Sequence, residues 1–146
     1  NIKNDKPILV DANMILAGIK KSLLPAGLQL KCFLDADGVL DIAKEMATTR
    51  SAAAVEFWRP FLDGAIVSIG NAPTALFHLL DMLEDPECPR PAVIFGFPVG
   101  FIGAAESKAH LIEKDLGIPY ITLKGRLGGS ALAAAAINAV LFEATK

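Results

Sequence analysis

The sequence predicts a single α/β domain in which a parallel sheet lies between layers of helices. Short apolar runs alternate with longer segments of helical periodicity, as expected of crossover connections between parallel strands. No Asn-Gly or Asp-Gly turn joins two of the apolar runs as a hairpin. The chain has 146 residues, of which 53% are hydrophobic and 21% charged, and this suits one domain with one core.

The first half of the chain begins with a strand. Residues 7–11 are consecutively apolar before a final acid, which suits a strand buried on both faces. A short helix is expected over 13–19 and a second strand over 28–34. Residues 37–47 then have the spacing of a helix with one apolar side.

A break at residues 48–51 separates this helix from the next one, expected over 52–58. Threonine and serine hydroxyls in the break are expected to cap its opening amides. The third strand is predicted over 65–69. A helix follows it, with Asn71 as its cap and Pro73 tolerated in its first turn.

The last part of the chain repeats the alternation. The remaining elements are strand, helix, strand and helix, expected over 92–97, 104–116, 119–123 and 131–143. Five strands in this order favour a three-layer α/β/α domain over a barrel. The sheet is then five-stranded, parallel and doubly wound, with flavodoxin-like order, and residues 1–146 form one domain.

Composition and charge restrict the classes of function. The net charge of -2 argues mildly against a nucleic-acid partner. No apolar run reaches transmembrane length without a charge, glycine or proline, so no membrane partner is expected. Cys32 and Cys88 do not have metal-ligand spacing, and we expect no bound metal. Free thiols are favoured over a disulfide, which indicates a cytoplasmic protein.

Three glycine-rich loops are expected at the carboxyl edge of the sheet, where such proteins bind their ligands. They span residues 70–74, 96–103 and 125–130, and each leads from a strand into a helix. Opening amides of helices attract anions, and Arg50 and Arg126 can bind carboxylates beside them. The sequence therefore predicts a groove for several anionic groups. The alternative is that the glycines only form tight turns and that the arginines are solvated.

Other ionisable side chains have competing interpretations: Asp11, Asp35, His78, Glu106, Lys108 and His110. The histidines can act as general bases, but both lie inside helices beyond the loops, which favours structural or surface roles. The aspartates end strands, where they act in acid–base chemistry or, more often, cap the following helix. The glutamate and the lysine lie in the first turns of a helix. For the glutamate, a pocket role and stabilisation of the helix dipole are equally consistent.

Four segments carry a family resemblance. They are residues 49–55, 70–76, 98–108 and 128–131, which read TRSAAAV, GNAPTAL, PVGFIGAAESK and GGSA. With these segments in order, the chain resembles the precorrin-8X methylmutase family, whose anaerobic branch acts on cobalt-precorrin-8. The resemblance extends over nearly the whole chain, from Pro7 to Ala139.

The resemblance implies an isomerase of cobalamin biosynthesis. The family moves a methyl group between adjacent ring carbons of a corrin precursor that carries many carboxylates, and gives hydrogenobyrinate or cobyrinate. It needs no organic cofactor and is homodimeric, with the pocket near the subunit interface. The resemblance and the glycine-rich loops together predict these substrate-binding residues: Arg50, Ser51, Asn71, Ala72, Thr74, Gly100, Phe101, Gly103, Ala104, Arg126, Gly129 and Ser130.

The family's proton-donating histidine belongs to a segment before the first strand, whereas this chain begins at Asn1, close to that strand. We therefore assign no catalytic residue within residues 1–146 and expect the family's histidine upstream of Asn1. The hypothesis is that this chain binds a corrinoid without isomerising it. The leading interpretation of the domain remains an isomerase, and one alternative is a corrinoid-binding module without catalysis. The other, a nucleotide-binding flavodoxin-like domain, is disfavoured because no phosphate or flavin motif is present.

Overall fold

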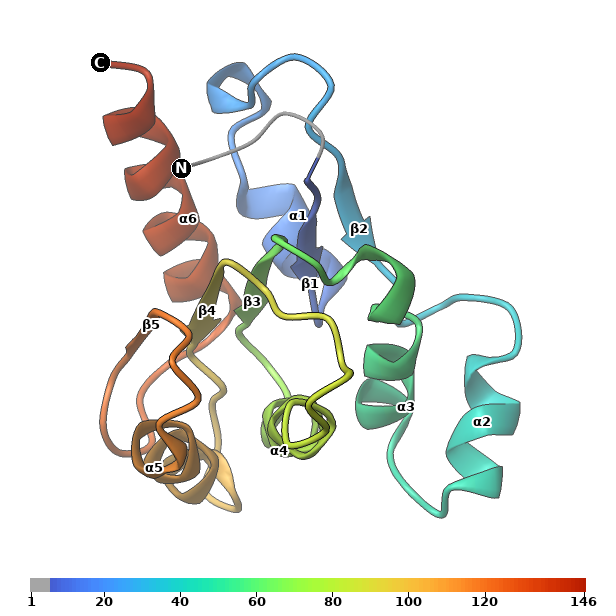
Figure 1. The fold of residues 1–146 in the computed structure, drawn as a ribbon. Helices are drawn as coiled ribbons and strands as arrows, with labels where there is room; N and C mark the ends of the chain where they lie inside the picture. Colours follow the sequence, from blue (N-terminus) through green and yellow to red (C-terminus); the bar gives the residue numbers. More distant parts are fainter. Residues whose placement is uncertain (1–5) are drawn as a thin grey trace.

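Five parallel strands form the centre of the computed structural model, which describes residues 6–146 (Figure 1). The strands are β1 (Ile8–Val10), β2 (Leu30–Cys32), β3 (Ile66–Ile69), β4 (Val93–Gly96) and β5 (Tyr120–Thr122). Their order is β2-β1-β3-β4-β5, and all neighbouring strands are parallel. The predicted doubly wound sheet of flavodoxin-like order is confirmed.

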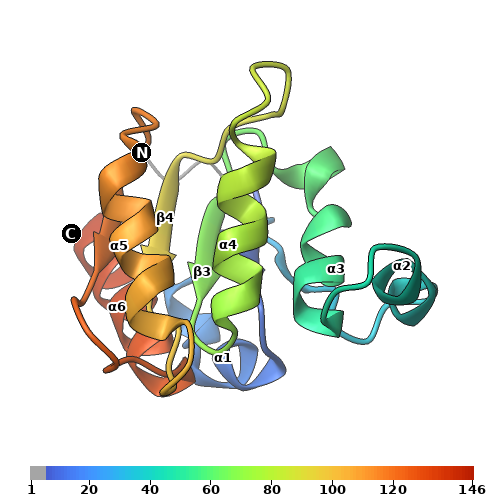
Figure 2. The same ribbon diagram turned by 90° about the horizontal axis from the view of Figure 1, so that it is seen from below.

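Helices cover both faces of the sheet, as Figure 2 shows. On one face lie α3 (Arg50–Glu56), α4 (Pro73–Met82) and α5 (Ala104–Lys114), and on the other lie α1 (Asn13–Gly18) and α6 (Ser130–Ala144). The longest helix has 15 residues, and none of the helices within the described part of the chain can span a bilayer.

Successive residues of a strand face two different cores. Leu9 and Val67 belong to the core beneath α3, α4 and α5, whereas Ile8 and Val10 belong to the core beneath α1 and α6. Because both faces are buried, the central strands are apolar at successive positions rather than at alternate ones. This explains the uninterrupted apolar runs in the sequence.

Several predicted boundaries shift by a few residues. The helix expected over 37–47 is α2 (Val39–Glu45), which packs on α3. The helix expected to restart at Ala52 begins instead at Arg50, because the Thr49 hydroxyl at its N-cap accepts the Ala52 amide at 3.1 Å. Arg50 therefore stands inside the first helical turn rather than before it.

The end of α1 meets α6 at a close contact. A Cβ atom at Gly18 would lie 2.7 Å from the Cβ of Ala134, within the minimum separation of such atoms. The side-chain amide of Asn138 on α6 joins the same segment: its Nδ2 donates to the carbonyl of Gly18 at 2.9 Å, and its Oδ1 accepts the Lys20 amide at 2.8 Å. The path of the chain leaving α1 is therefore fixed by α6.

Replacement of Gly18 by alanine should destabilise the protein by about 1–3 kcal/mol, since two methyl groups cannot occupy this space. Ala134→Gly removes the opposing methyl group, at a cost in helix propensity of about 1 kcal/mol. In a double-mutant cycle measured by urea unfolding, Gly18→Ala should cost less in the Ala134→Gly background than alone. Equal costs in the two backgrounds would contradict the proposed clash.

Candidate functional site

All five strands end at the same edge of the sheet, and α4 and α5 begin there (Figure 2). The loops that follow β3, β4 and β5 at this edge are the three glycine-rich loops. They lead into α4, α5 and α6 respectively. The parallel sheet therefore gathers the helix starts that the sequence marked as candidate anion sites.

A buried carboxylate organises the first of these loops. Asp11 follows β1 and is only 3% exposed. Its Oδ1 accepts the Gly70 amide at 2.9 Å, and its Oδ2 accepts the amides of Asn71 at 3.1 Å and Ala72 at 2.7 Å. Burial raises the pKa of Asp11, and the amide hydrogen bonds act against this rise. The Asp11 side chain thus supplies the hydrogen-bond acceptors for the amides before α4.

Two predictions about this loop need correction. Asn71 does not cap α4, because Ala72 stands at the N-cap. Asp11 does not cap the helix that follows it in sequence; its oxygens accept amides before α4, because β1 and β3 are neighbours in the sheet. The backbone amides of Asn71 and Ala72 are therefore already occupied by an internal carboxylate.

Arg50 lies beside the ends of β1 and β2. Its Nη1 is 3.2 Å from Oδ1 of Asp35, and the other oxygen of Asp35 accepts from Asn13 Nδ2 at 2.9 Å. The hydroxyls of Thr49 and Thr74 lie 2.8 Å apart and join the start of α3 to the start of α4. The Arg50 side chain is 48% exposed, so its guanidinium can bind a further anion.

The second and third loops also contact each other. The carbonyl of Phe97 accepts the Gly129 amide at 2.9 Å. A Cβ at Gly128 would lie 2.4 Å from the same carbonyl oxygen, so only glycine permits this approach. The guanidinium carbon of Arg126 lies 5.0 Å from the centre of the Phe101 ring, within the range of a cation–π contact.

The remaining predicted residues lie on the same edge. Ser51 and Ala104 belong to the first turns of α3 and α5, Gly103 is the N-cap of α5, and Ser130 begins α6. Gly100 lies in the loop before α5. The twelve residues predicted from the sequence thus come from the starts of four helices and the loops before them.

Large apolar side chains are exposed at this edge. Phe101 is 84% exposed, Ile102 91% and Leu127 74%. Exposed apolar groups next to polar ones are typical of ligand-binding surfaces. The edge therefore suits a ligand that has both apolar faces and anionic groups.

Lys108 lies one turn into α5 and is completely buried. Its Nζ donates to the carbonyl of Gly125 at 2.9 Å and to the carbonyl of Leu127. Burial lowers the pKa of Lys108, and no acidic side chain within residues 6–146 forms an ion pair with it. The sequence places this lysine near a helix start but does not indicate its contact with a loop 17 to 19 residues later.

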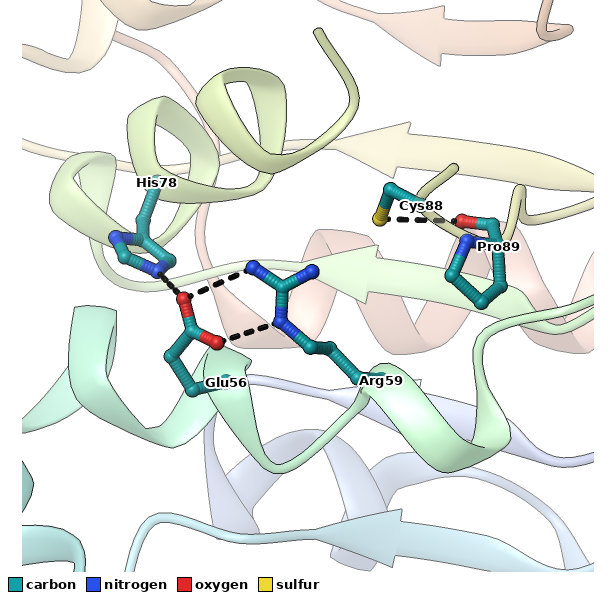
Figure 3. A network of polar contacts seen from close by, with 5 residues as sticks. All are labelled: Glu56, Arg59, His78, Cys88 and Pro89. Atoms are coloured by element: carbon teal, nitrogen blue, oxygen red, sulfur yellow. Dashed lines mark hydrogen bonds and ion pairs between the residues drawn. The ribbon is translucent and has the colours of Figure 1, made fainter. Parts of the chain in front are cut away.

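Neither histidine lies on the glycine-rich loops. Nε2 of His78 is 2.8 Å from Oε1 of Glu56, and the other carboxylate oxygen accepts from Arg59 Nε at 2.7 Å (Figure 3). Hydrogen bonds from Arg59 and His78 lower the pKa of Glu56, and an ionised carboxylate only accepts, so His78 is the donor. His110 packs beside the ring of Phe77. These contacts support structural roles for both histidines.

A metal site is also not evident. Within residues 6–146, no three histidine, cysteine, aspartate or glutamate residues cluster as metal ligands would. Cys88 is buried and Cys32 is half-buried, and both are free thiols.

Sequence comparison relates this chain to a characterised family. Residues 1–143 match the family described as CbiC, precorrin-8X methylmutase. The chain is 54% identical over 136 residues to precorrin-8X methylmutase of Pseudomonas aeruginosa, covering 93% of this chain and 65% of that protein. It is 39% identical over 140 residues to cobalt-precorrin-8 methylmutase of Methanocaldococcus jannaschii, covering 96% and 62%. The chain thus spans somewhat less than two thirds of the length of these relatives.

Two solved structures resemble the fold closely. One, described as a precorrin-8X methylmutase related protein, gives a TM-score of 0.85 at 32% identity and covers 94% of this chain and 71% of that one. The other, precorrin-8X methylmutase from Thermus thermophilus, gives a TM-score of 0.82 at 38% identity and covers 96% and 67%.

Asp11→Asn should destabilise the protein by about 2–3 kcal/mol, because an amide NH₂ would face backbone donors that need an acceptor. Asp35→Asn is the matched control: it changes an aspartate at the end of the neighbouring strand, whose ion pair is exposed, and should cost about 0–1 kcal/mol. Urea unfolding measures both. Similar losses for the two variants would contradict the special role of Asp11.

Proposed function

Because the chain belongs to the precorrin-8X methylmutase family, we propose that the whole protein moves a methyl group on precorrin-8X or cobalt-precorrin-8 in cobalamin biosynthesis. The observation that carries this proposal is the arrangement of one sheet edge. Helix starts, two arginines and exposed apolar side chains meet there. A corrinoid has an apolar macrocycle and many carboxylates, and it fits this combination. A cytoplasmic location belongs to the proposal, and cell fractionation tests it.

Each part of the edge has a binding role in this proposal. Arg50 and Arg126 hold carboxylates of the corrinoid through paired N–H donors. The hydroxyls of Ser51, Thr74 and Ser130 donate further hydrogen bonds to the corrinoid at three helix starts. Loop residues Gly100–Ala104 and Gly129 line the space between them, and the apolar side chains contact the macrocycle.

The reaction needs positioning more than added reagents. The methyl group leaves one ring carbon and bonds to the adjacent carbon, so substrate and product are isomers and no oxidant or reductant is consumed. A bound, correctly oriented macrocycle lowers the entropic part of this barrier, and a proton donor promotes the rearrangement. The two histidines of the chain lie more than a turn into α4 and α5, so we assign the donor role to neither.

The positions of the two histidines inside α4 and α5 favour a second candidate. It is that these 146 residues bind a corrinoid without isomerising it. The two candidates separate in one experiment, in which the purified chain is mixed with precorrin-8X and its visible spectrum is followed. Binding alone should shift the spectrum without forming hydrogenobyrinate. Normal turnover would eliminate the binding-only candidate, and absence of any spectral change would contradict corrinoid binding by this chain.

Arg50→Ala should weaken hydrogenobyrinate binding by about 10- to 100-fold, the loss expected for a charged hydrogen bond to a carboxylate. The control is Lys146→Ala, which removes the same charge just beyond the C-terminal end of α6, away from the glycine-rich loops. Titration by visible absorbance measures both affinities. Equal affinities of Arg50→Ala and the parent protein would remove Arg50 from the binding site.

A homodimer is also part of the proposed function. β5 is an edge strand with Ile121 and Leu123 exposed, and α6, which packs on β3 and β4, exposes Leu132 and Phe142. An unpaired apolar edge of this kind is stabilised when a second copy covers it. Ile121→Asp should therefore convert a dimer to a monomer in sedimentation velocity, whereas Leu40→Asp on α2 should not. A parent protein that sediments as a monomer would contradict the dimer.

A further inference from the structure

The loop before α6 is held at three points, two of them by Lys108, which is not among the proposed binding residues. Lys108 bonds the carbonyls of Gly125 and Leu127, and the Gly129 amide bonds the carbonyl of Phe97. Arg126 lies between the two carbonyls that Lys108 anchors. The backbone is therefore fixed on both sides of Arg126, although its side chain is exposed.

A buried lysine is a costly way to fill space. Burying an ammonium group without a carboxylate costs free energy, which hydrogen bonds offset only in part. A methionine would occupy a similar volume without that cost. What the ammonium group adds is a set of N–H donors, and two of them are used on the loop. Lys108 therefore acts on the loop, by donating hydrogen bonds to its carbonyls.

Fixing the loop also fixes the place of a cationic side chain. The guanidinium of Arg126 lies over the exposed ring of Phe101, on the loop before α5. Both Lys108 and Phe101 belong to the chain segment that forms α5 and its approach. Arg126 thus meets the same segment twice, through its own side chain and through its flanking carbonyls.

From this geometry we infer that Lys108 is a positioning residue, which holds Arg126 where it binds a carboxylate of the corrinoid. The inference rests on the proposed function for the identity of the ligand. Lys108 itself touches no ligand, because it is completely buried. It acts by reducing the conformational freedom that Arg126 would otherwise lose on binding.

A double-mutant cycle tests this coupling. Hydrogenobyrinate is titrated into the parent chain, Lys108→Met, Arg126→Ala and the double variant, with visible absorbance as the signal. Each single change should weaken binding by about 10-fold, and the double variant should be little weaker than either, because both remove the same contact. Independent effects would instead multiply to about 100-fold, and that result would overturn the inference, as would unchanged affinity of Lys108→Met.

Ser107→Ala is the matched control. Ser107 is also completely buried on α5, but its hydroxyl donates to the carbonyl of Ala104 in the same helix rather than to the loop. This variant should bind hydrogenobyrinate as the parent does. Trypsin supplies a second measurement: cleavage after Lys124 and Arg126 should be faster in Lys108→Met than in the parent or Ser107→Ala. Equal cleavage rates would contradict the anchoring of the loop.

The parent chain can fail to bind the ligand, and Lys108→Met can fail to fold. If the parent chain does not bind hydrogenobyrinate, the proposed function fails, while the trypsin comparison still decides whether Lys108 holds the loop. If circular dichroism shows that Lys108→Met is unfolded, Lys108→Gln replaces it, because glutamine keeps a shorter N–H donor. The cycle with Arg126→Ala is then read in the same way.

Discussion

The hydrogen bonds between the Asp11 carboxylate and the amides of the loop after β3 fix the loop at the centre of the candidate site. In sheets of this order, the crevice between β1 and β3 is the usual ligand position, and here a carboxylate of the protein itself occupies part of it. The loop that Asp11 fixes carries Thr74, which contacts Thr49 at the start of α3. Its Asn71 carbonyl also accepts the Val99 amide of the next loop at 3.4 Å. Two neighbouring segments thus take their positions from one buried charge.

The fold was predictable because its determinants are local. Apolar runs of strand length and helical spacing are visible within short windows, and their alternation limits the topology to few choices. Helix starts were less predictable because they depend on distant partners. Asp11 is 59 residues from Gly70, so only the neighbouring positions of β1 and β3 bring them together. Thr49, in contrast, caps a helix three residues away, and the sequence correctly indicated a hydroxyl cap in that break.

The glycine-rich loops predicted where the candidate site lies. They did not predict which side chains within it form ion pairs and hydrogen bonds with one another. Arg50 was predicted to bind a ligand carboxylate or to be solvated, whereas it pairs with Asp35 at the end of another strand. A carboxylate ligand must therefore share or displace Asp35. The partners of Lys108 are backbone carbonyls, which have no signature in the sequence. A buried amine needs acceptors, but the sequence did not indicate that Lys108 is buried.

The position of α2 affects how a large ligand reaches this edge. Its main packing partner is α3, whereas the other helices pack on the sheet or on a neighbouring helix of the same face. A hollow of about 390 Å³ lies between α2, the segment before it and Arg50. An element with so few buried partners opens at a lower free energy than global unfolding, and its amides exchange with solvent correspondingly sooner. Local opening of α2 can thus enlarge this hollow beside Arg50 while the sheet and its two cores stay intact.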